Sequence, residues 1–470
     1  MKLLHVWQRL TSQQRKDIAQ NLVTHVPKIR TDTARLLAYL LENPTIKVDN
    51  FDKNAAFRYL YNEKPYNDVW LRMAQSQLLK GIEQFVALRT MQSDKITVAY
   101  HIAEFYAQDS EQLPYFAQAL QELSAKTDDI AQRDENHYTI LLRTENLRLR
   151  NSVKKREIAA ENLQNILDLQ EKHFAAGQLR TVCMALSHQV FHQNSFDFGL
   201  FEVLVQRIEK ANWQETEPLI GAYYFLYKMA TLPDEETYFS VFRKNMPQYI
   251  AIFTRKEQYE CYVFALNYVI KRVNKGEQAY FRTLFELYKE GIENGILLME
   301  NGEINPMTFR NIVNTGLRIG EAAYIAVFLE KYKPLLPRAV RRNYYEHALA
   351  RYYFATSDFD NATKLFLNLN YGELPLQLDA KMVLIKIYYE TDNYDALDKH
   401  LSSFQQFLHR KRASLSYHQA NYKNIIAFAK RLINLNQNDK KSVECLRNDI
   451  QRTSPLTEKE WLLAKISLWI

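Results

Sequence analysis

Apolar and polar positions repeat along the C-terminal part of the chain, most clearly within residues 344–407. Apolar and aromatic residues at 349, 350, 353 and 354 precede a polar turn at 358–361, and a second apolar stretch follows with Ala362 and Phe366. The same order returns 35 residues later, at 384–389 and at the turn 393–395. Apolar spacings of three and four residues are typical of one face of an α-helix. The pattern therefore predicts two consecutive helix–turn–helix pairs of similar structure.

Weaker forms of this pairing extend back to about residue 95. The expected helices are 96–108, 112–124, 135–150, 153–174, 179–192, 197–209, 216–229, 233–245, 256–274, 277–294, 305–318, 321–332, 414–434, 440–452 and 461–470. A single helical pair cannot bury its apolar face alone, so neighbouring pairs are expected to stack into one continuous core. The predicted fold class is all-α, an α-solenoid of helix–turn–helix pairs. The last helix is expected to cap it and fold back over the final repeat.

The first 90 residues show shorter helical periods, at 11–26, 31–41, 50–62 and 69–88. They predict a small helical cap, or a helix-turn-helix unit in which 69–88 is the recognition helix. That helix offers only Arg72 and Lys80 for phosphate contacts, which favours the cap. The expected organisation is a helical cap over 1–90, irregular helical hairpins over 91–337, and repeats with a C-terminal capping helix over 338–470.

Composition agrees with long helices joined by short loops. The chain of 470 residues contains only 11 glycines and 12 prolines, which leaves little material for β-turns. Its three cysteines, Cys183, Cys261 and Cys445, lie far apart, so neither a disulfide framework nor a thiolate zinc site is expected. Each lies in an apolar helical context that predicts a buried, inert thiol. With an apolar run at the start too short for a signal peptide, a cytoplasmic location and no membrane association are expected.

The net charge of +7 is spread over the chain, with both signs interspersed. Short basic clusters occur at 154–156, 338–342 and 409–412. Each lies where a helix is expected to begin or end, which favours a solvated helix terminus over a nucleic-acid patch. Nucleic-acid binding is therefore possible but not favoured.

The repeated segment resembles a tetratricopeptide repeat. Residues 346–369 carry the apolar pair 349–350, the aromatic pair 353–354, the turn 358–360, the small Ala362 and the aromatic Phe366. Leu397 replaces the small residue in the next pair, and Glu346 stands where such repeats often have tryptophan. The whole chain is also similar to an uncharacterised family of bacterial helical proteins, through 64–66, 308–313 and 455–462. These resemblances imply a helical repeat fold and no particular chemistry.

Motifs for catalysis or cofactor binding are weak. His188 and His192 have the i, i+4 spacing of a helical zinc site, but Gln189 stands where the general base of a zinc hydrolase would be. No glycine-rich phosphate loop and no G-x-S-x-G elbow is present. No enzymatic activity, catalytic residue, metal site or cofactor is predicted, and a zinc hydrolase at the two histidines is a distant alternative.

The candidate binding residues lie on the first helix of each repeated pair. If the tetratricopeptide register holds, these helices line a concave groove. The residues expected to point into it are Tyr344, His347, Arg351 and Phe354 from one pair, and Asp379, Met382, Lys386 and Tyr389 from the next. Arg351 and Lys386 occupy equivalent positions, and the resemblance implies that such cations hold a carboxylate of a bound peptide. Ordinary solvated helix positions are the simpler interpretation for any one of them.

These patterns predict a non-catalytic scaffold that binds a protein or peptide segment in the groove of a helical superhelix. The alternative is a nucleic-acid-associated regulator, with residues 1–90 as a helix-turn-helix and the repeats as a sensor or dimerisation arm. The oligomeric state is left open by the sequence.

Overall fold

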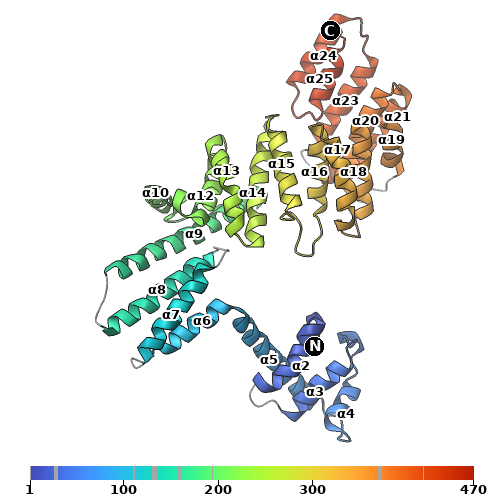
Figure 1. Ribbon diagram of the computed structural model, residues 1–470. Coiled ribbons are helices and arrows are strands. Elements are labelled where there is room, and N and C mark those ends of the chain that lie inside the picture. The colour runs from blue at the N-terminus through green and yellow to red at the C-terminus, as the bar shows by residue number, and fades with distance from the viewer. Residues whose placement is uncertain are drawn as a thin grey trace. The chain divides into compact units, whose positions relative to one another are not determined.

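A computed structural model describes residues 2–25, 30–108, 112–129, 135–155, 160–192, 194–368, 373–415 and 418–469. These residues fold almost entirely into α-helices (Figure 1), with short 3-10 turns at η1 (Val48–Asn50) and η3 (Lys333–Leu335) and an isolated bridge between Leu298 and Ile304. The described part of the chain contains no β-strand. The all-α prediction is confirmed.

Contacts group the chain into two compact units, Met1–Tyr223 and Tyr224–Ile470. The predicted divisions at residues 90 and 337 lie inside these units. The helices of the first unit are α1 (Lys2–Arg9), α2 (Ser12–His25), α3 (Thr31–Glu42), α4 (Lys53–Tyr61), α5 (Asp68–Ser93), α6 (Lys95–Tyr106), α7 (Leu113–Asp128), α8 (Glu135–Lys155), α9 (Ala160–His192), α10 (Phe201–Lys210) and α11 (Trp213–Thr216). The division itself falls within α12 (Pro218–Thr231).

Helices α1 to α5 share one apolar core, in which Trp7, Leu36, Phe57 and Leu78 are fully buried. The long helix α5 begins at an N-cap, where the Asn67 side chain accepts hydrogen bonds from the backbone N–H groups of residues 69 and 70. Its apolar face packs on α1, α2 and α3. This core takes one apolar stripe of α5, and most other residues of the helix, Arg72 and Lys80 among them, are exposed.

Helix α9 corrects one sequence expectation. A break between residues 174 and 179 was expected around Gly177, but α9 runs without interruption from residue 160 to 192. Ala175, Ala176 and Leu179, which flank the glycine, are at most 2% exposed. A glycine inside a helix costs only about 1 kcal/mol relative to alanine. Burial of the flanking residues therefore outweighs the weak local preference for a helix end.

The second unit continues with α13 (Glu236–Ile252), α14 (Arg255–Asn274), α15 (Tyr280–Glu293), α16 (Pro306–Arg318), α17 (Ala322–Tyr332), α18 (Arg341–Ala355), α19 (Phe359–Asn368), α20 (Leu374–Glu390), α21 (Tyr394–Arg410), α22 (Arg412–Leu415), α23 (His418–Asn434), α24 (Lys440–Arg452) and α25 (Lys459–Ser467). Helix α13 passes through Pro247 and ends seven residues beyond the predicted end at 245. Met246 and Tyr249, on either side of the proline, are buried, so tertiary packing again sets the helix length.

Four helical pairs of the second unit are joined by the same turn. In the pair α18–α19 the backbone N–H of Asp358 donates to the carbonyl of Tyr353 over 2.8 Å, and Ser357 is left-handed with φ of 63°. In α20–α21 the N–H of Asn393 donates to the carbonyl of Tyr388 over 2.9 Å, and the φ of Asp392 is 55°. Equivalent bonds with a left-handed glycine follow α14 and α16, at residues 276 and 320. This arrangement is the Schellman motif that ends a helix and turns the chain back.

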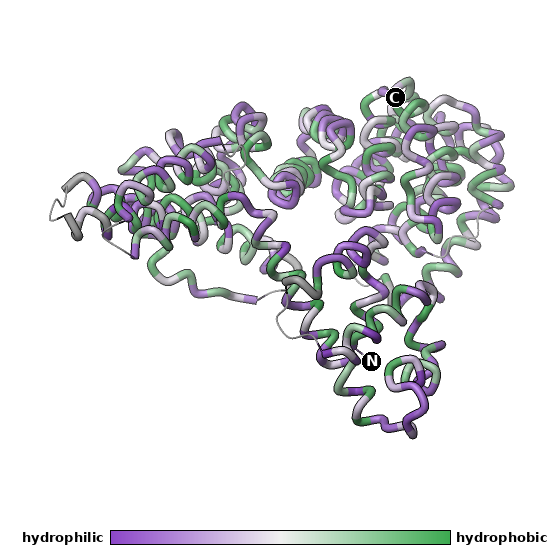
Figure 2. Tube along the Cα trace, turned by 60° about the horizontal axis from the view of Figure 1, so that its bottom comes forward, coloured by the Kyte–Doolittle hydropathy of each residue, from purple (hydrophilic) through white to green (hydrophobic). Residues whose placement is uncertain are grey.

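Close helix crossings hold these pairs together. A Cβ built on Gly316 of α16 would lie 2.6 Å from Cδ1 of Ile325 and 2.8 Å from Cε2 of Phe285, so the absence of a side chain permits the approach. Helix α18 contacts α16, α17, α19 and α20. Figure 2 shows hydrophobic and hydrophilic residues interspersed along the helices of the chain, as expected for amphipathic helices. The pair α18–α19 therefore packs on the pair before it and on the pair after it.

Candidate partner-binding face of the C-terminal unit

The eight candidate residues lie on two neighbouring helices at identical spacing. Tyr344, His347, Arg351 and Phe354 belong to α18, and Asp379, Met382, Lys386 and Tyr389 occupy the corresponding positions of α20, 35 residues later. Three side chains of α16 extend this set. Asn314 accepts a hydrogen bond from Nε of Arg351 at 3.2 Å, and the contacts of Arg310 and Arg318 are given below. We call the surface that is formed by the partly exposed members of this set the α16/α18/α20 face; they are Arg310, Asn314, Arg318, Arg351, Phe354, Asp379, Lys386, Tyr389 and the neighbouring Glu390. Sequence reasoning missed the contribution of α16, although its three residues show the helical spacing i, i+4, i+8.

Asp379 is the electrostatic centre of this face. Its carboxylate lies 2.9 Å from Nε2 of His347, 3.7 Å from Nη1 of Arg351 and 4.0 Å from Nη2 of Arg310. Burial opposes ionisation of Asp379, but Arg351, His347 and Arg310 together hold its pKa below its ordinary value. The three candidates Asp379, His347 and Arg351 thus meet at one point and form a compact charge cluster.

His347 and Tyr344 are buried beneath the face. His347 is 1% exposed, and burial lowers its pKa below the ordinary value, against the opposing influence of Asp379. Tyr344 is 3% exposed, and its hydroxyl donates a hydrogen bond to the Glu373 carboxylate. Burial, together with this bond, raises the pKa of Tyr344. These two side chains therefore lie in the interior beneath the face and are not available to a binding partner.

Lys386 and Tyr389 contact a segment that lies about 70 residues further along the chain. The ammonium of Lys386 is 2.5 Å from the carboxylate of Glu458, and the ring of Tyr389 meets the Trp461 ring edge to face at 5.4 Å. On the next turn of α20, Glu390 accepts hydrogen bonds from Nε1 of Trp461 at 3.0 Å and from Nζ of Lys465 at 2.6 Å. The C-terminal segment therefore covers the exposed end of α20.

The same segment reaches beyond the last helical pairs. Glu460 accepts hydrogen bonds from Nη2 of Arg318 at 2.8 Å and from Nε2 of Gln278 at 2.6 Å. At its beginning, the carbonyl of Pro455 accepts a hydrogen bond from Asn424 of α23 at 2.8 Å. Residues 455–465 thus bridge α23, α20 and α16. The last helix contacts α23 and α24 of the final pair, as the sequence predicts, and the segment before it also reaches Arg318 of α16, well before that pair.

The remaining candidates are Phe354 and Met382. Phe354 is half-buried, and the ammonium of Lys386 lies 5.9 Å from its ring centroid, within the range of a cation–π contact. Met382 is buried in the apolar cluster formed with α21, α23, α24 and α25. Phe354 therefore belongs to the surface that the C-terminal segment approaches, whereas Met382 lies in the core.

Comparison with protein-family models, with curated proteins and with solved structures finds no match.

The histidine pair and the cysteines add no chemical centre to this face. His188 is exposed, with its ring 6.0 Å from the ring of Phe196, and the side chain of His192 lies outside the described part of the structure. Among the described residues no group of three or more His, Cys, Asp or Glu side chains is arranged to hold a metal ion. Cys183 and Cys261 are buried as expected, and burial raises the pKa of Cys183. The expectation of burial is wrong for Cys445, which is exposed.

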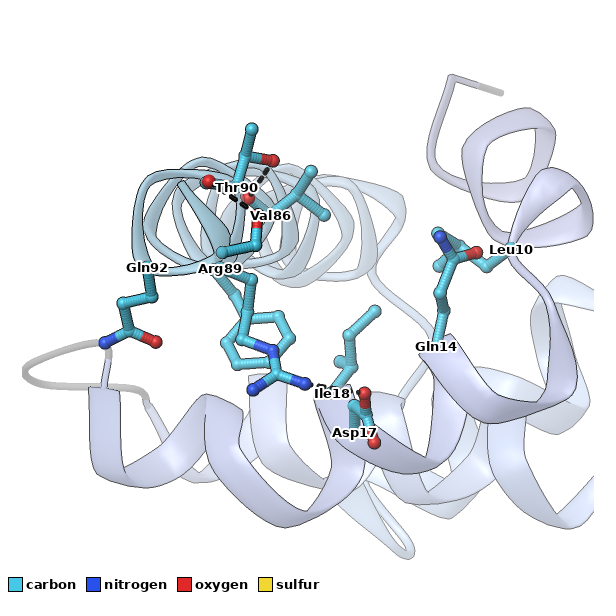
Figure 3. A pocket seen from close by; sticks show the side chains of 10 residues that line it. Leu10, Gln14, Asp17, Ile18, Val86, Arg89, Thr90 and Gln92 are labelled. Atoms are coloured by element: carbon cyan, nitrogen blue, oxygen red, sulfur yellow. Dashed lines mark hydrogen bonds and ion pairs between the residues drawn. The ribbon is translucent and has the colours of Figure 1, made fainter. Parts of the chain in front are cut away.

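The N-terminal unit contains a pocket of about 430 Å³ between α2 and α5 (Figure 3). Its wall includes the ion pair of Arg89 with Asp17, 3.0 Å apart, beside the buried Phe85 and Ile18. On α5, Arg72 pairs with Asp68 on its own helix at 2.8 Å, and Lys80 is exposed. The helix-turn-helix alternative stays a prediction. In the described residues no helix combines the length and the apolar character needed to cross a membrane.

Proposed function

We propose that the protein is a non-catalytic interaction scaffold whose helical pairs form a tetratricopeptide-like α-solenoid. It binds a segment of a partner protein on the α16/α18/α20 face. The observation that carries the proposal is that this face holds a piece of polypeptide, residues 455–465 of its own chain, through contacts of the kind used in peptide recognition.

Those contacts combine charge and an aromatic anchor. The carboxylates next to Lys386 and Arg318 come from Glu458 and Glu460 of the segment, whereas Asp379 is enclosed by residues of its own face. Trp461 supplies a ring against Tyr389 and an N–H to Glu390. Aromatic anchors and charge-assisted hydrogen bonds are the groups that carry binding energy at protein interfaces.

Repetition supports the solenoid part of the proposal. The pairs that begin with α14, α16, α18 and α20 end their first helix with the same turn, and α18 contacts both α16 and α20. In a stack of this kind the first helices of successive pairs lie side by side. Side chains at equivalent positions then form a row, as Arg351 and Lys386 do in the sequence.

Site-specific cross-linking tests the proposal. Replacing Tyr394 with benzoylphenylalanine places a photo-reactive ring beside Tyr389, because the two tyrosine rings are 6.0 Å apart and Tyr394 is exposed. The same replacement at Tyr259, an exposed position on α14, is the matched control. In the native host, we expect a defined partner to be cross-linked from position 394 and not from 259. Identical products from both positions would refute the binding face.

A charge variant sharpens the result. Lys386→Glu combined with Arg318→Glu should remove the position-394 product because both variants reverse cations of the face. Arg342→Glu should retain the product, because Arg342 is 80% exposed and pairs with Glu346 one turn along its own helix, away from the face. Loss of the product in the double variant and also in Arg342→Glu would show that the overall positive charge of the protein, and not this face, directs binding.

A further inference from the structure

The C-terminal segment lies on the surface to which the proposed function assigns the partner. We infer that residues 455–465 are an internal competitor, and that the partner is an acidic segment with an aromatic residue that takes their place. This inference rests on the proposed function and adds to it the chemistry of the partner and the means by which the face is regulated.

The contacts of the segment specify what a replacement must offer. Glu458 and Glu460 are two residues apart and meet cations from different helices, Lys386 of α20 and Arg318 of α16. Trp461 follows at once and fills the position between Tyr389 and Glu390. A partner segment therefore needs two carboxylates at i, i+2 and an adjacent ring with a hydrogen-bond donor, and a basic or purely apolar segment would leave both cations uncompensated.

The segment is held in a way that allows exchange. Helix α25 has only nine residues, and a helix of that length is not stable by itself in water. One of its ion pairs is partly solvated: the side chain of Glu460 is 67% exposed and that of Arg318 is 45% exposed, and such a pair contributes little to stability. Apolar burial also holds the segment in place, because Leu462 and the adjoining Ile466 of α25 are fully buried.

The turn into α25 carries conformational strain at the residue that reaches Lys386. Glu458 has φ of 56° and ψ of 26°, the left-handed region that is unfavourable for residues with a side chain other than Asn or Asp. A partner segment that brings a carboxylate to Lys386 from an ordinary backbone conformation avoids this strain. The resident segment has the opposite advantage, because its attachment to the same chain gives it a high effective concentration. Binding of a partner is therefore an exchange between a tethered, strained segment and a free, relaxed one.

The inference is tested by adding the resident segment as a separate peptide. The probe is a fluorescently labelled peptide with the sequence of residues 453–470, titrated into full-length proteins. The first is the natural protein, and the second carries Glu458→Lys, Glu460→Lys and Trp461→Ala, which remove the contacts of these three residues to α16 and α20 and leave only the pair of Lys465 with Glu390 among the contacts to these helices described above. We expect the second protein to bind the peptide at least tenfold more tightly. The control is Glu300→Lys with Glu444→Lys, two exposed acids away from the face, which should bind the peptide as the natural protein does.

Specificity is tested with a peptide in which the residues equivalent to Glu458 and Glu460 are lysine. This lysine peptide should not bind the protein that carries Glu458→Lys, Glu460→Lys and Trp461→Ala, called the loosened protein below. It should bind once Lys386→Glu and Arg318→Glu are added to that protein. Equal binding of both peptides would overturn the acidic partner. Failure of the loosened protein to bind the natural peptide, with unchanged helicity and melting, would show that residues 455–465 are a permanent structural cap.

Hydrogen exchange on the natural protein provides a measurement that needs no variant. Excess natural peptide should accelerate amide exchange in residues 459–467 severalfold, and the lysine peptide should not. Unchanged exchange with both peptides would overturn the inference. If exchange is unchanged but a partner is still cross-linked from position 394, the scaffold function stands and the partner has another chemistry. If neither faster exchange nor a cross-linked partner is found, the scaffold function is refuted as well.

Discussion

Replacement of Asp379 by asparagine should destabilise the C-terminal unit strongly. The carboxylate lies within 2.9 to 4.0 Å of His347, Arg351 and Arg310. One unit charge pair at 4 Å is worth about 4 kcal/mol at an effective dielectric constant of about 20. Breaking a buried pair from one side costs about 3–5 kcal/mol, whereas an exposed pair is worth at most about 1 kcal/mol. Because the side chain of Asp379 is 18% exposed, we expect a loss of about 2–4 kcal/mol.

Amide exchange in α18 and α20, followed by mass spectrometry, measures this loss within the unit that contains the substitution. In a unit of this size, 1 kcal/mol corresponds to about 2–4 °C in melting temperature, so a calorimetric shift of about 5–15 °C should accompany it. Asp398→Asn on the exposed side of α21 is the matched control and should leave both measurements unchanged. A loss below about 0.5 kcal/mol for Asp379→Asn, typical of an ordinary surface site, would refute the electrostatic account of the face.

The dependence of this effect on pH has a definite sign. The pKa of Asp379 is lower in the folded unit than in the unfolded chain. Its contribution is therefore present above the unfolded pKa of about 3.9, and it is lost as the pH falls below that value toward the folded pKa. The stability difference between the natural protein and Asp379→Asn should accordingly shrink in strong acid. A difference that grows on acidification would contradict the depressed pKa.

Two further substitutions test the packing and the titration of the same unit. Gly316→Ala should destabilise it by up to about 2 kcal/mol in denaturant titrations, because overpacking costs about 1–3 kcal/mol and the gain in helix propensity is only about 1 kcal/mol. The control is Gly81→Ala, where the nearest atom to a new Cβ would be 3.6 Å away. It should be neutral or stabilising. His400→Gln should flatten the pH dependence of unfolding between about 6.5 and 4, because burial lowers the pKa of His400 to about 4 from an ordinary value of about 6.5. As the pH falls across that interval, the free energy of unfolding of the natural protein should decrease by on the order of 3 kcal/mol, because the unfolded chain takes up the proton first. The control variant His409→Gln, at an exposed position, should show the same decrease.

Each of these two results has a clear contrary outcome. A stabilised Gly316→Ala protein would mean that α16 has room beside Ile325 and Phe285. An unchanged pH profile in His400→Gln would mean that His400 binds its proton equally in the folded and unfolded chain.

The repeated apolar pattern predicted the helical pairs well because the signal is local. The turn after Tyr353 and the turn after Tyr388 have the same hydrogen bonds, as expected from sequences that match at a distance of 35 residues. Local signals misplaced the helix end at Gly177, where burial of the neighbouring alanines extends α9. Pattern alone could not weigh a small propensity cost against tertiary packing.

The candidate site shows the same limit at longer range. Helical spacing placed Arg351 and Lys386 at equivalent positions, and periodicity alone suffices for that. Periodicity could not show that Arg351 forms an ion pair with Asp379 or that Lys386 forms one with Glu458, since these partners lie 28 and 72 residues away along the chain. The missed contribution of Arg310 has the same cause, because the pair that begins with α16 lacks the aromatic pattern that made the next two visible.

A charge exchange between Lys386 and Glu458 tests the central claim most directly. The measurement is amide exchange of residues 459–467 in four full-length proteins: natural, Lys386→Glu, Glu458→Lys and the double variant. Since the partners are 13% and 29% exposed, we expect a coupling of about 1 kcal/mol, within the range found for contacting residues. Each single variant should accelerate exchange about fivefold, and the double variant should return toward the natural rate. If the double variant exchanges as fast as the two single effects combined, the face does not recognise the acidic segment through this pair.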